Sequence, residues 1–209
     1  MIPRPQRVLF WILLISSVGM SVALIRMRER AHDRLLDAGE TMPLNPPAAI
    51  PAQKITMMIA NDADGSIGAG QQEMALPADA NARAHVILQH LIADYARPAS
   101  SHPIATNNGV NEVFFMTLPA DPSLPAGTAA TPGIMAIVNL SGSFAAVHPS
   151  GIEAETLTLL SIIGTLHANF PEITQVRFLV DGQPRDTLAG HADLTRVYVA
   201  SDAPGVKHL

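Results

Sequence analysis

The sequence contains no cysteine, and this absence rules out several kinds of chemistry. Without cysteine the 209-residue chain forms neither disulfides nor thiolate metal sites, and it has no cysteine nucleophile and no cysteine for a lipid anchor. Aromatic residues make up only 4% of the chain, so its core must consist mainly of Leu, Ile, Val, Met and Ala. The missing cysteine is compatible with either side of a bacterial inner membrane and does not identify the compartment.

The few charges are divided unevenly along the chain. Residues 1–34 contain six Arg against Glu29 and Asp33, a net charge of +4, whereas residues 35–209 contain seven Lys and Arg against sixteen Asp and Glu, a net charge of -9. An acidic domain repels phosphate backbones, so the composition argues against a nucleic-acid partner. The basic end lies beside an apolar run, where arginines favour anionic lipid headgroups.

An uncharged apolar run over residues 8–25 predicts a transmembrane anchor. Its 18 residues extend about 27 Å as a helix, close to the roughly 30 Å of a bilayer core. A cleaved signal peptide is one alternative, but it has a shorter apolar region and a small-residue cleavage site, whereas Arg26 follows this run directly. A buried core helix is the other alternative, and the arginines on both flanks argue against it.

The segment after the anchor predicts a linker. Residues 26–53 combine a polar stub with a run that holds four prolines between Pro43 and Pro51, and such a run suits an extended linker. The sequence therefore predicts five parts: a tail over 1–7, the anchor over 8–25, the linker over 26–53, one domain over 54–199 and a tail over 200–209.

Alternating apolar residues and turn signals predict the strands of this domain. The predicted strands cover 54–60, 71–76, 111–118, 135–140, 176–180 and 183–188. Asp79 is suited to cap a helix over 80–96, and Asp181-Gly182 predicts a tight turn. These elements predict an α/β fold of the α+β two-layer kind, with a mixed β-sheet and two helices in the order ββα-ββα-ββ, preceded by the transmembrane helix.

The second helix has the clearest local signals. Ser150 and Glu153 have the spacing of a capping box, and Pro171 ends the helix. Glycine inside an exposed helix costs about 1 kcal/mol relative to alanine, so Gly164 predicts close packing against a neighbour. Apolar residues at helical spacing predict one buried stripe, which consists of Ile152, Leu159, Ile163, Leu166 and Phe170.

Several parts of the sequence carry a family resemblance. They are the Asn139-Leu140-Ser141-Gly142-Ser143-Phe144 run, the segment from Leu157 to Leu194 with Phe170-Pro171, Val176 to Gly182 and Gly190-His191-Ala192-Asp193, and the helix start Leu76-Pro77-Ala78-Asp79 after two strands. Together they resemble the GerMN domain family, which is named for a protein of bacterial sporulation and spore germination. The resemblance covers about residues 54–199.

The resemblance implies an extracytoplasmic α/β module, usually on a lipid or membrane anchor, that binds other proteins and has no known catalysis. In the sporulation case the module supports assembly of a ring-like channel complex. This chain has one domain where that protein has two, and it has no lipid-modified cysteine, so a role in sporulation is not carried over.

Two indications oppose each other on the orientation of the anchor. More arginines follow the apolar run than precede it, which by the positive-inside rule leaves the domain in the cytoplasm. The resemblance implies the opposite side, and we adopt it. The expected location is therefore the inner (cytoplasmic) membrane, as a single-pass protein whose domain faces the periplasm or the outside.

No residues in the sequence form a recognisable active site. His191 and Asp193 are the most suggestive pair, because a histidine close to an acid can act as a base or a ligand. Residues two apart after a glycine more often hold a bend through bonds to the backbone, and we predict that role. Asp62 and Glu73 are interpreted as part of a polar hairpin turn and not a calcium loop, and His167 is predicted to be structural. Three further sets lack the pattern of a site: His85 and His90 lack metal-pair spacing, Asp181 and Asp186 a cleft, and Ser141-Gly142-Ser143 the nucleophile-elbow motif. We thus expect no catalytic, cofactor-binding or metal-binding residues.

The leading functional hypothesis is a membrane-anchored, non-enzymatic module that binds protein in an envelope assembly. Partner contacts are expected from exposed sheet edges or from the long connection over 119–132. A module that binds cell-wall glycan or lipid is the alternative, although the single Trp falls in the anchor and only two Tyr are present. A hydrolase is a third possibility.

Overall fold

The structure, a computed structural model, describes Met20 and residues 51–106, 108–119 and 133–203. The described residues from Pro51 onward belong to one compact unit. Within this described part, no helix is both long and apolar enough to cross a bilayer. The anchor predicted over 8–25 lies outside the described residues except for Met20, as do most of the linker and most of the 119–132 connection, so these remain predictions.

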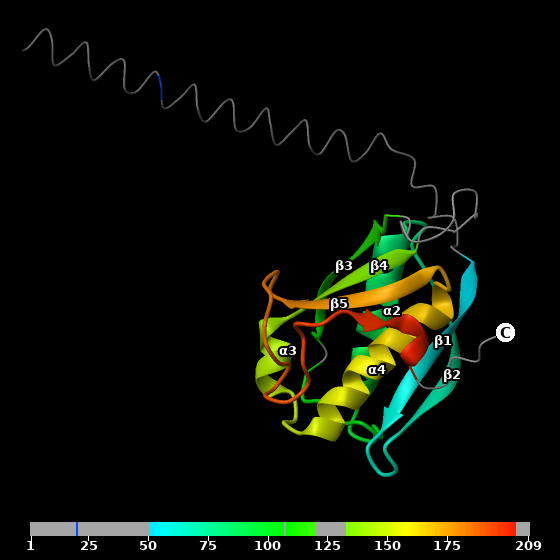
Figure 1. Ribbon diagram of the computed structural model, residues 1–209. Helices are drawn as coiled ribbons and strands as arrows, with labels where there is room; N and C mark the ends of the chain where they lie inside the picture. The colour runs from blue at the N-terminus through cyan, green and yellow to red at the C-terminus, as the bar shows by residue number, and fades with distance from the viewer. Residues whose placement is uncertain (1–19, 21–50, 107, 120–132, 204–209) are drawn as a thin grey trace, which may run out of the picture. The chain divides into compact units, whose positions relative to one another are not determined.

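The described part of the domain is a mixed α/β structure with two sheets and three α-helices (Figure 1). The strands are β1 (Ala52–Asn61), β2 (Ser66–Ala75), β3 (Val110–Thr117), β4 (Ile134–Leu140), β5 (Ile173–Val180) and β6 (Tyr198–Val199). The helices are α2 (Ala80–Tyr95), α3 (Gly142–Val147) and α4 (Ile152–Asn169), and a short 3-10 helix, η1, covers Ala200–Asp202.

The two sheets differ in size and connection. β1 and β2 form an antiparallel ribbon. The other four strands lie in the order β3-β4-β5-β6, with β4 and β5 parallel and the remaining pairs antiparallel. The apolar strand β4 pairs on both sides, as its composition predicts. The parallel pair requires a crossover, which α3 and α4 provide.

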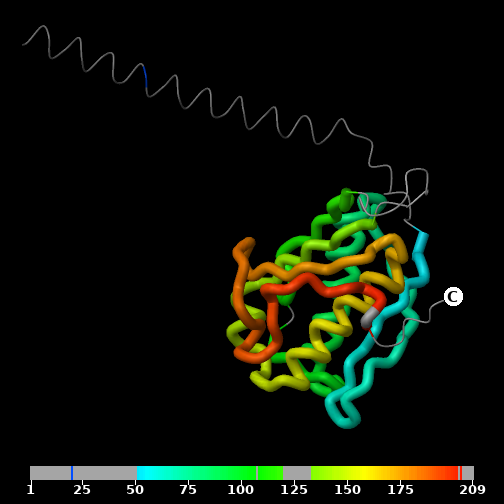
Figure 2. The backbone as a smooth tube through the Cα atoms, in the orientation of Figure 1, coloured from blue at the N-terminus to red at the C-terminus, as the bar shows by residue number. Residues whose placement is uncertain are grey.

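The two long helices fill the space next to both sheets (Figure 1). α2 packs against β3, while α4 packs against β1 and also contacts α2 and β5. After β5 the chain, orange to red in Figure 2, passes beside α4 before it reaches β6. Every described strand except β2, and all three helices, contribute buried residues to the core, and Ile67 and Met74 of β2 pack against it. Its largest fully buried side chains include Tyr95, Phe144 and Phe178.

Several local predictions are confirmed. Asp79 caps α2 by accepting a hydrogen bond from the Ala82 N–H at 2.8 Å. Asp181 and Gly182 have φ values of 48° and 75°, the left-handed pair that a tight hairpin turn requires. A Cβ built on Gly164 would lie 3.0 Å from Met58 Cγ, so the glycine does permit close packing of α4 on β1.

Other local predictions are wrong. The single mixed sheet is two sheets, because side chains of α4 rather than a further strand pair with the free edge of β1. The strand predicted over 183–188 makes only isolated bridges, of Gln183 with Val180 and of Thr187 with Asp193, and Pro184 within it has no N–H to pair. The short helix α3 was not predicted.

The start of α4 also differs from its prediction. Gly151 is the N-cap and its N–H donates to Glu155 Oε1 at 3.2 Å, so the predicted capping box of Ser150 and Glu153 does not form. Ile152 is 73% exposed because the covered part of the helix begins one turn later, while the other four residues of the predicted stripe are buried.

The contact at Gly164 gives a stability prediction. We expect Gly164→Val to lower the free energy of unfolding by about 2 kcal/mol, because the added methyls meet Met58 and the helix cannot shift away from β1. Gly164→Ala should change it by less than about 1 kcal/mol, since better helix propensity offsets the crowding. Chemical denaturation measures both, with Ala168→Val at an exposed position of α4 as the control. Equal stability of Gly164→Val and the wild type would contradict this account.

Candidate functional site

A row of polar residues runs along the buried side of α4. Helical spacing of three or four residues places them on one face of the helix. Glu155, Thr158, Ser161 and Thr165 are each 0% exposed, and Asn169 at the end of the row is partly buried. The row, which we call the α4 polar row, consists of Glu155, Thr158, Ser161, Thr165 and Asn169. Buried polar groups need hydrogen-bond partners, so each member identifies a segment that the helix holds in place.

Glu155 holds the segment that follows β5. Its Oε2 accepts hydrogen bonds from the N–H groups of Ala189, His191 and Ala192 at 3.0, 3.0 and 2.8 Å. Its Oε1 accepts from the His191 Nδ1 at 3.0 Å and from the Gly151 N–H. Burial raises the pKa of Glu155, but the hydrogen bonds from Ala189, Ala192 and His191 outweigh it and lower the pKa to about 2. The group is thus a buried carboxylate that stays ionised.

His191 and Asp193, the pair singled out in the sequence, do not bond to each other. His191 pairs with Glu155, whereas Asp193 Oδ1 accepts from the N–H and hydroxyl of Thr195 at 2.8 and 2.7 Å. Glu155 and Asp193 therefore both fix the backbone conformation of this bend through hydrogen bonds to N–H groups, the role that the sequence predicts for Asp193. The sequence did not identify Glu155 as the partner, because it lies 36 residues away along the chain.

A shallow hollow lies beside this segment. It has a volume of about 260 Å³, and its lining includes Leu159, His191, Asp193, Arg196 and Tyr198. The guanidinium of Arg196 stacks 4.2 Å from the centre of the Tyr198 ring. The hollow is therefore partly filled by the protein's own cation and ring. The Ser150 hydroxyl lies 3.4 Å from His191 Nδ1, but that nitrogen is the one that bonds to Glu155, and Ser150 does not line the hollow.

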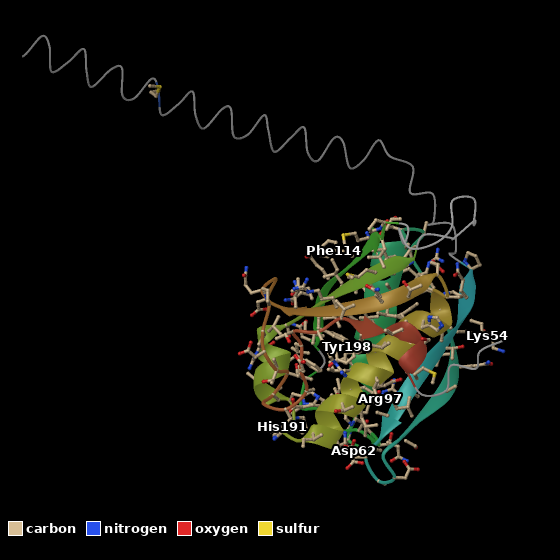
Figure 3. The ribbon with its side chains drawn as sticks, in the orientation of Figure 1. Lys54, Asp62, Arg97, Phe114, His191 and Tyr198 are labelled. Carbon is tan, nitrogen blue, oxygen red and sulfur yellow. The ribbon has the colours of Figure 1, made fainter. Side chains whose placement is uncertain are left out.

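Thr158, the next member of the α4 polar row, contacts two buried histidines. His102 Nε2 and His148 Nε2 lie 2.6 and 2.8 Å from Thr158 Oγ1. The other nitrogen of His102 lies 2.5 Å from Asp62 Oδ1, and that of His148 lies 2.8 Å from the Pro149 carbonyl oxygen. Figure 3 labels Asp62 and His191, which both lie near the first turns of α4.

Hydrogen counting limits how these contacts are satisfied. A threonine hydroxyl has one proton and can donate to only one imidazole, while each histidine needs a proton on Nδ1 to donate to Asp62 or Pro149. The Thr158 hydroxyl also donates to the Ala154 carbonyl at 3.1 Å, so its single proton is shared among three neighbours. Burial lowers the pKa of His148, so His148 is the neutral partner.

The order carboxylate, imidazole and hydroxyl in Asp62, His102 and Thr158 is also the order of a catalytic triad. The geometry does not give this set a substrate. Thr158 is 0% exposed and also contacts the Ala154 carbonyl and His148, and these residues do not line the hollow beside His191. The arrangement joins three parts of the chain through hydrogen bonds: Asp62 in the β1–β2 turn, His102 in the segment that follows α2, and Thr158 in α4. It is a buried hydrogen-bonded junction.

The last members of the α4 polar row bind the free edge of β1. Thr165 Oγ1 accepts from the Met58 N–H at 2.9 Å, and Asn169 bonds to both the N–H and the carbonyl of Thr56. Further along, the Tyr95 hydroxyl accepts from the Ala60 N–H at 3.0 Å and also bonds with Ser161. Side chains thus replace a neighbouring strand along this edge.

The other candidates from the sequence have local partners. His85 Nε2 bonds to the Val110 carbonyl, His90 Nε2 to Gln72 Oε1, and His167 Nδ1 to the Ile173 carbonyl. Asp181 accepts from the Gly142 N–H, and Ser141 caps α3. Among the described residues, no group of three or more His, Asp or Glu is arranged to hold a metal ion.

A surface of a different kind lies on the side of the four-stranded sheet that faces away from the helices. Directly paired residues share a face of a sheet, and the pairs Phe114–Ile137 and Met116–Met135 place four apolar side chains together. Phe114, Met116 and, at the far strand, Val199 are 46%, 47% and 47% exposed. We call this surface, made by Phe114, Met116, Met135 and Ile137, the outer sheet face. Gln175 pairs with both Met135 and Val199 and so separates Val199 from it.

The contacts of Glu155 give a prediction of stability and its pH dependence. We expect Glu155→Gln to lower the free energy of unfolding by about 3 kcal/mol. The glutamine side chain would place an NH2 donor against backbone N–H groups that now donate to the carboxylate. In the wild type the depressed pKa means that the unfolded chain binds the proton first. The stabilisation that Glu155 gives the folded chain is therefore complete above its ordinary pKa of 4.5. It falls by roughly 2 kcal/mol, allowing for solvent screening, as the pH drops from about 4.5 to about 2.

Denaturation of both proteins between pH 7 and pH 2 measures this effect. The loss over the acidic window should be smaller in Glu155→Gln by the amount that Glu155 contributes. Parallel curves for the two proteins would show that folding does not shift the pKa of Glu155 and would contradict the assigned hydrogen bonds.

The junction at Thr158 gives a second prediction. Thr158→Val keeps the shape of the side chain but leaves Nε2 of both histidines without a partner, so we expect the free energy of unfolding to fall by about 2 kcal/mol. Thr156→Val, on the same helix at an exposed position, is the matched control and should change it by less than about 0.5 kcal/mol. Similar stability of the two variants would contradict the assigned hydrogen bonds.

No curated protein matches the sequence significantly. Among solved structures, a crystal structure of a Clostridium perfringens protein described as a lipoprotein is similar, with 21% identity, coverage of 77% of this chain and 95% of that chain, and a TM-score of 0.37. The Germane family model, described as sporulation and spore germination, matches residues 61–186. The match covers more than half of the sequence and confirms the resemblance to GerMN domains, so this chain belongs to the Germane family of sporulation and spore germination domains.

Proposed function

We propose that this chain is a non-enzymatic, extracytoplasmic module, anchored in the inner membrane through residues 8–25, that binds another protein of the cell envelope. The outer sheet face is the observation that carries the proposal. A contiguous apolar surface rimmed by polar residues is typical of a protein-binding site. Here the exposed Phe114 and Met116 lie beside Ile137 and Met135, and family membership supports a binding role.

The charges around the outer sheet face indicate what the partner offers. Arg177 lies opposite Ile137 on this face and makes no salt bridge within the described part of the chain. Binding of the partner would bury the exposed Arg177, and a buried arginine needs an acidic group beside it. We therefore expect the bound protein to present an apolar patch that includes a carboxylate. The excess of acidic residues after residue 34 remains an argument against nucleic acid.

Photo-crosslinking in cells of the source organism tests the proposal. A photoreactive residue replaces Phe114 in the full-length chain or, as a control, the exposed Lys54 of β1. We expect one discrete protein adduct from position 114 and none from position 54. Ile137→Lys places a charge in the centre of the outer sheet face and should reduce the adduct about tenfold, whereas Glu73→Lys, an exposed change on β2, should leave it intact.

Two results would contradict the proposal. Equal adducts from positions 114 and 54 would show that the outer sheet face has no special role. Loss of every protein adduct, with retention of the chain on purified cell wall or lipid, would favour the glycan- or lipid-binding alternative.

A further inference from the structure

The open edge of β3 is a feature that the proposed function does not use. β3 is an outer strand of the four-stranded sheet, so the backbone groups on its far side have no neighbouring strand among the described residues. From Val113 to Thr117 the strand contains no charge, no proline and no bulge, the devices that usually protect such an edge. The irregularity in its pairing lies before this stretch, between Val110 and Glu112.

The direction of the backbone groups follows from one hydrogen bond. The Phe115 N–H donates to Asn81 Oδ1 of α2 at 3.1 Å, so it points away from β4. In an antiparallel pair the N–H and carbonyl of a residue point to the same side, and residues two apart are equivalent. The N–H and carbonyl groups of Val113, Phe115 and Thr117 therefore all point outward, and within the described residues only the Phe115 N–H among them has a partner.

A groove runs beside this edge. It has a volume of about 200 Å³ and lies between the first turns of α2, which contribute Asn81, Ala82 and His85, and residues 111–114 at the start of β3. Its lining thus combines outward backbone groups with the side of Phe114. An occupant that satisfies these groups must itself present backbone N–H and carbonyl groups at strand spacing.

The edge of β1 shows the contrast within the same chain. There Thr56, Met58 and Ala60 donate their N–H groups to side chains of α4 and α2. That edge is closed by the protein itself. At β3, α2 supplies partners only for the Phe115 N–H and the Val110 carbonyl, so no described residue pairs with the other outward backbone groups of Val113, Phe115 and Thr117.

We propose that an extended segment of the partner protein adds to the β3 edge as a fifth strand of the sheet. This inference rests on the proposed function and specifies how the partner is bound. Side chains on one side of the added strand would lie beside Glu112, Phe114 and Met116, which share the outer face of β3. The segment is therefore expected to carry a basic residue and two apolar residues at alternate positions.

Backbone recognition can be tested with peptides. A display library of peptides of about ten residues is selected on the full-length wild-type chain, and enriched peptides are synthesised with single N-methylated amides. We expect a basic residue and apolar residues at alternate positions. Only every second amide of the added strand faces β3. Methylation of one of these amides should weaken binding about tenfold, while methylation of an amide between them should have little effect.

Two substitutions in the chain complete the test. Thr117→Pro removes one outward N–H at an exposed position and should weaken the peptide about tenfold, whereas Thr117→Val keeps that N–H and should bind like the wild type. Asn81→Ala releases the Phe115 N–H and should tighten binding severalfold. No enrichment, peptides that tolerate methylation of either parity, or equal binding by both Thr117 variants would overturn the inference.

The outcomes separate this inference from the proposed function. If Ile137→Lys abolishes the cellular adduct while Thr117→Pro leaves it unchanged, the partner binds the outer sheet face without adding a strand. That result would overturn strand addition and leave the proposed function standing. Loss of the adduct in both variants supports both.

Discussion

The structure depends on the need to satisfy polar groups that α4 carries into the interior. An ionised carboxylate and three hydroxyls lie completely buried along one helix. Each would be strongly destabilising without partners. The partners come from segments far apart in the sequence, from the β1–β2 ribbon to the bend before β6, so the helix fixes their positions through its own hydrogen bonds.

This constraint explains why the domain has two sheets instead of the predicted one. Thr165 and Asn169 bond to the backbone of β1 in the way that a neighbouring strand would. β1 therefore needs no further strand, and the ribbon stays separate from the four-stranded sheet. Glu155 acts in the same way on the segment after β5, because it binds the N–H groups of Ala189 and Ala192.

Local signals carried the sequence-based predictions that are confirmed. The Asp79 cap, the Asp181-Gly182 turn and the apolar strand β4 each depend on neighbouring residues, and Gly164 was correctly expected to lie against another element. The α4 polar row depends on contacts over as many as 113 residues, so propensity could not reveal its partners. One signal was available: Glu155, Thr158, Ser161 and Thr165 recur at helical spacing in a helix whose other sides are apolar.

The distribution of polar and apolar groups also separates structural residues from surfaces available for binding. The residue types that suggest catalysis, such as Asp62, His102 and Thr158, are bonded to one another around a hydroxyl that is completely buried. Apolar side chains, by contrast, remain exposed on the outer sheet face, next to a strand edge that no other described strand pairs with. A partner that covers this region buries apolar surface and also forms backbone hydrogen bonds with the strand edge. Both contacts contribute to its binding free energy. The binding role is therefore expected at β3 and the face beside it, while the histidines and acids hold the scaffold on which that face is built.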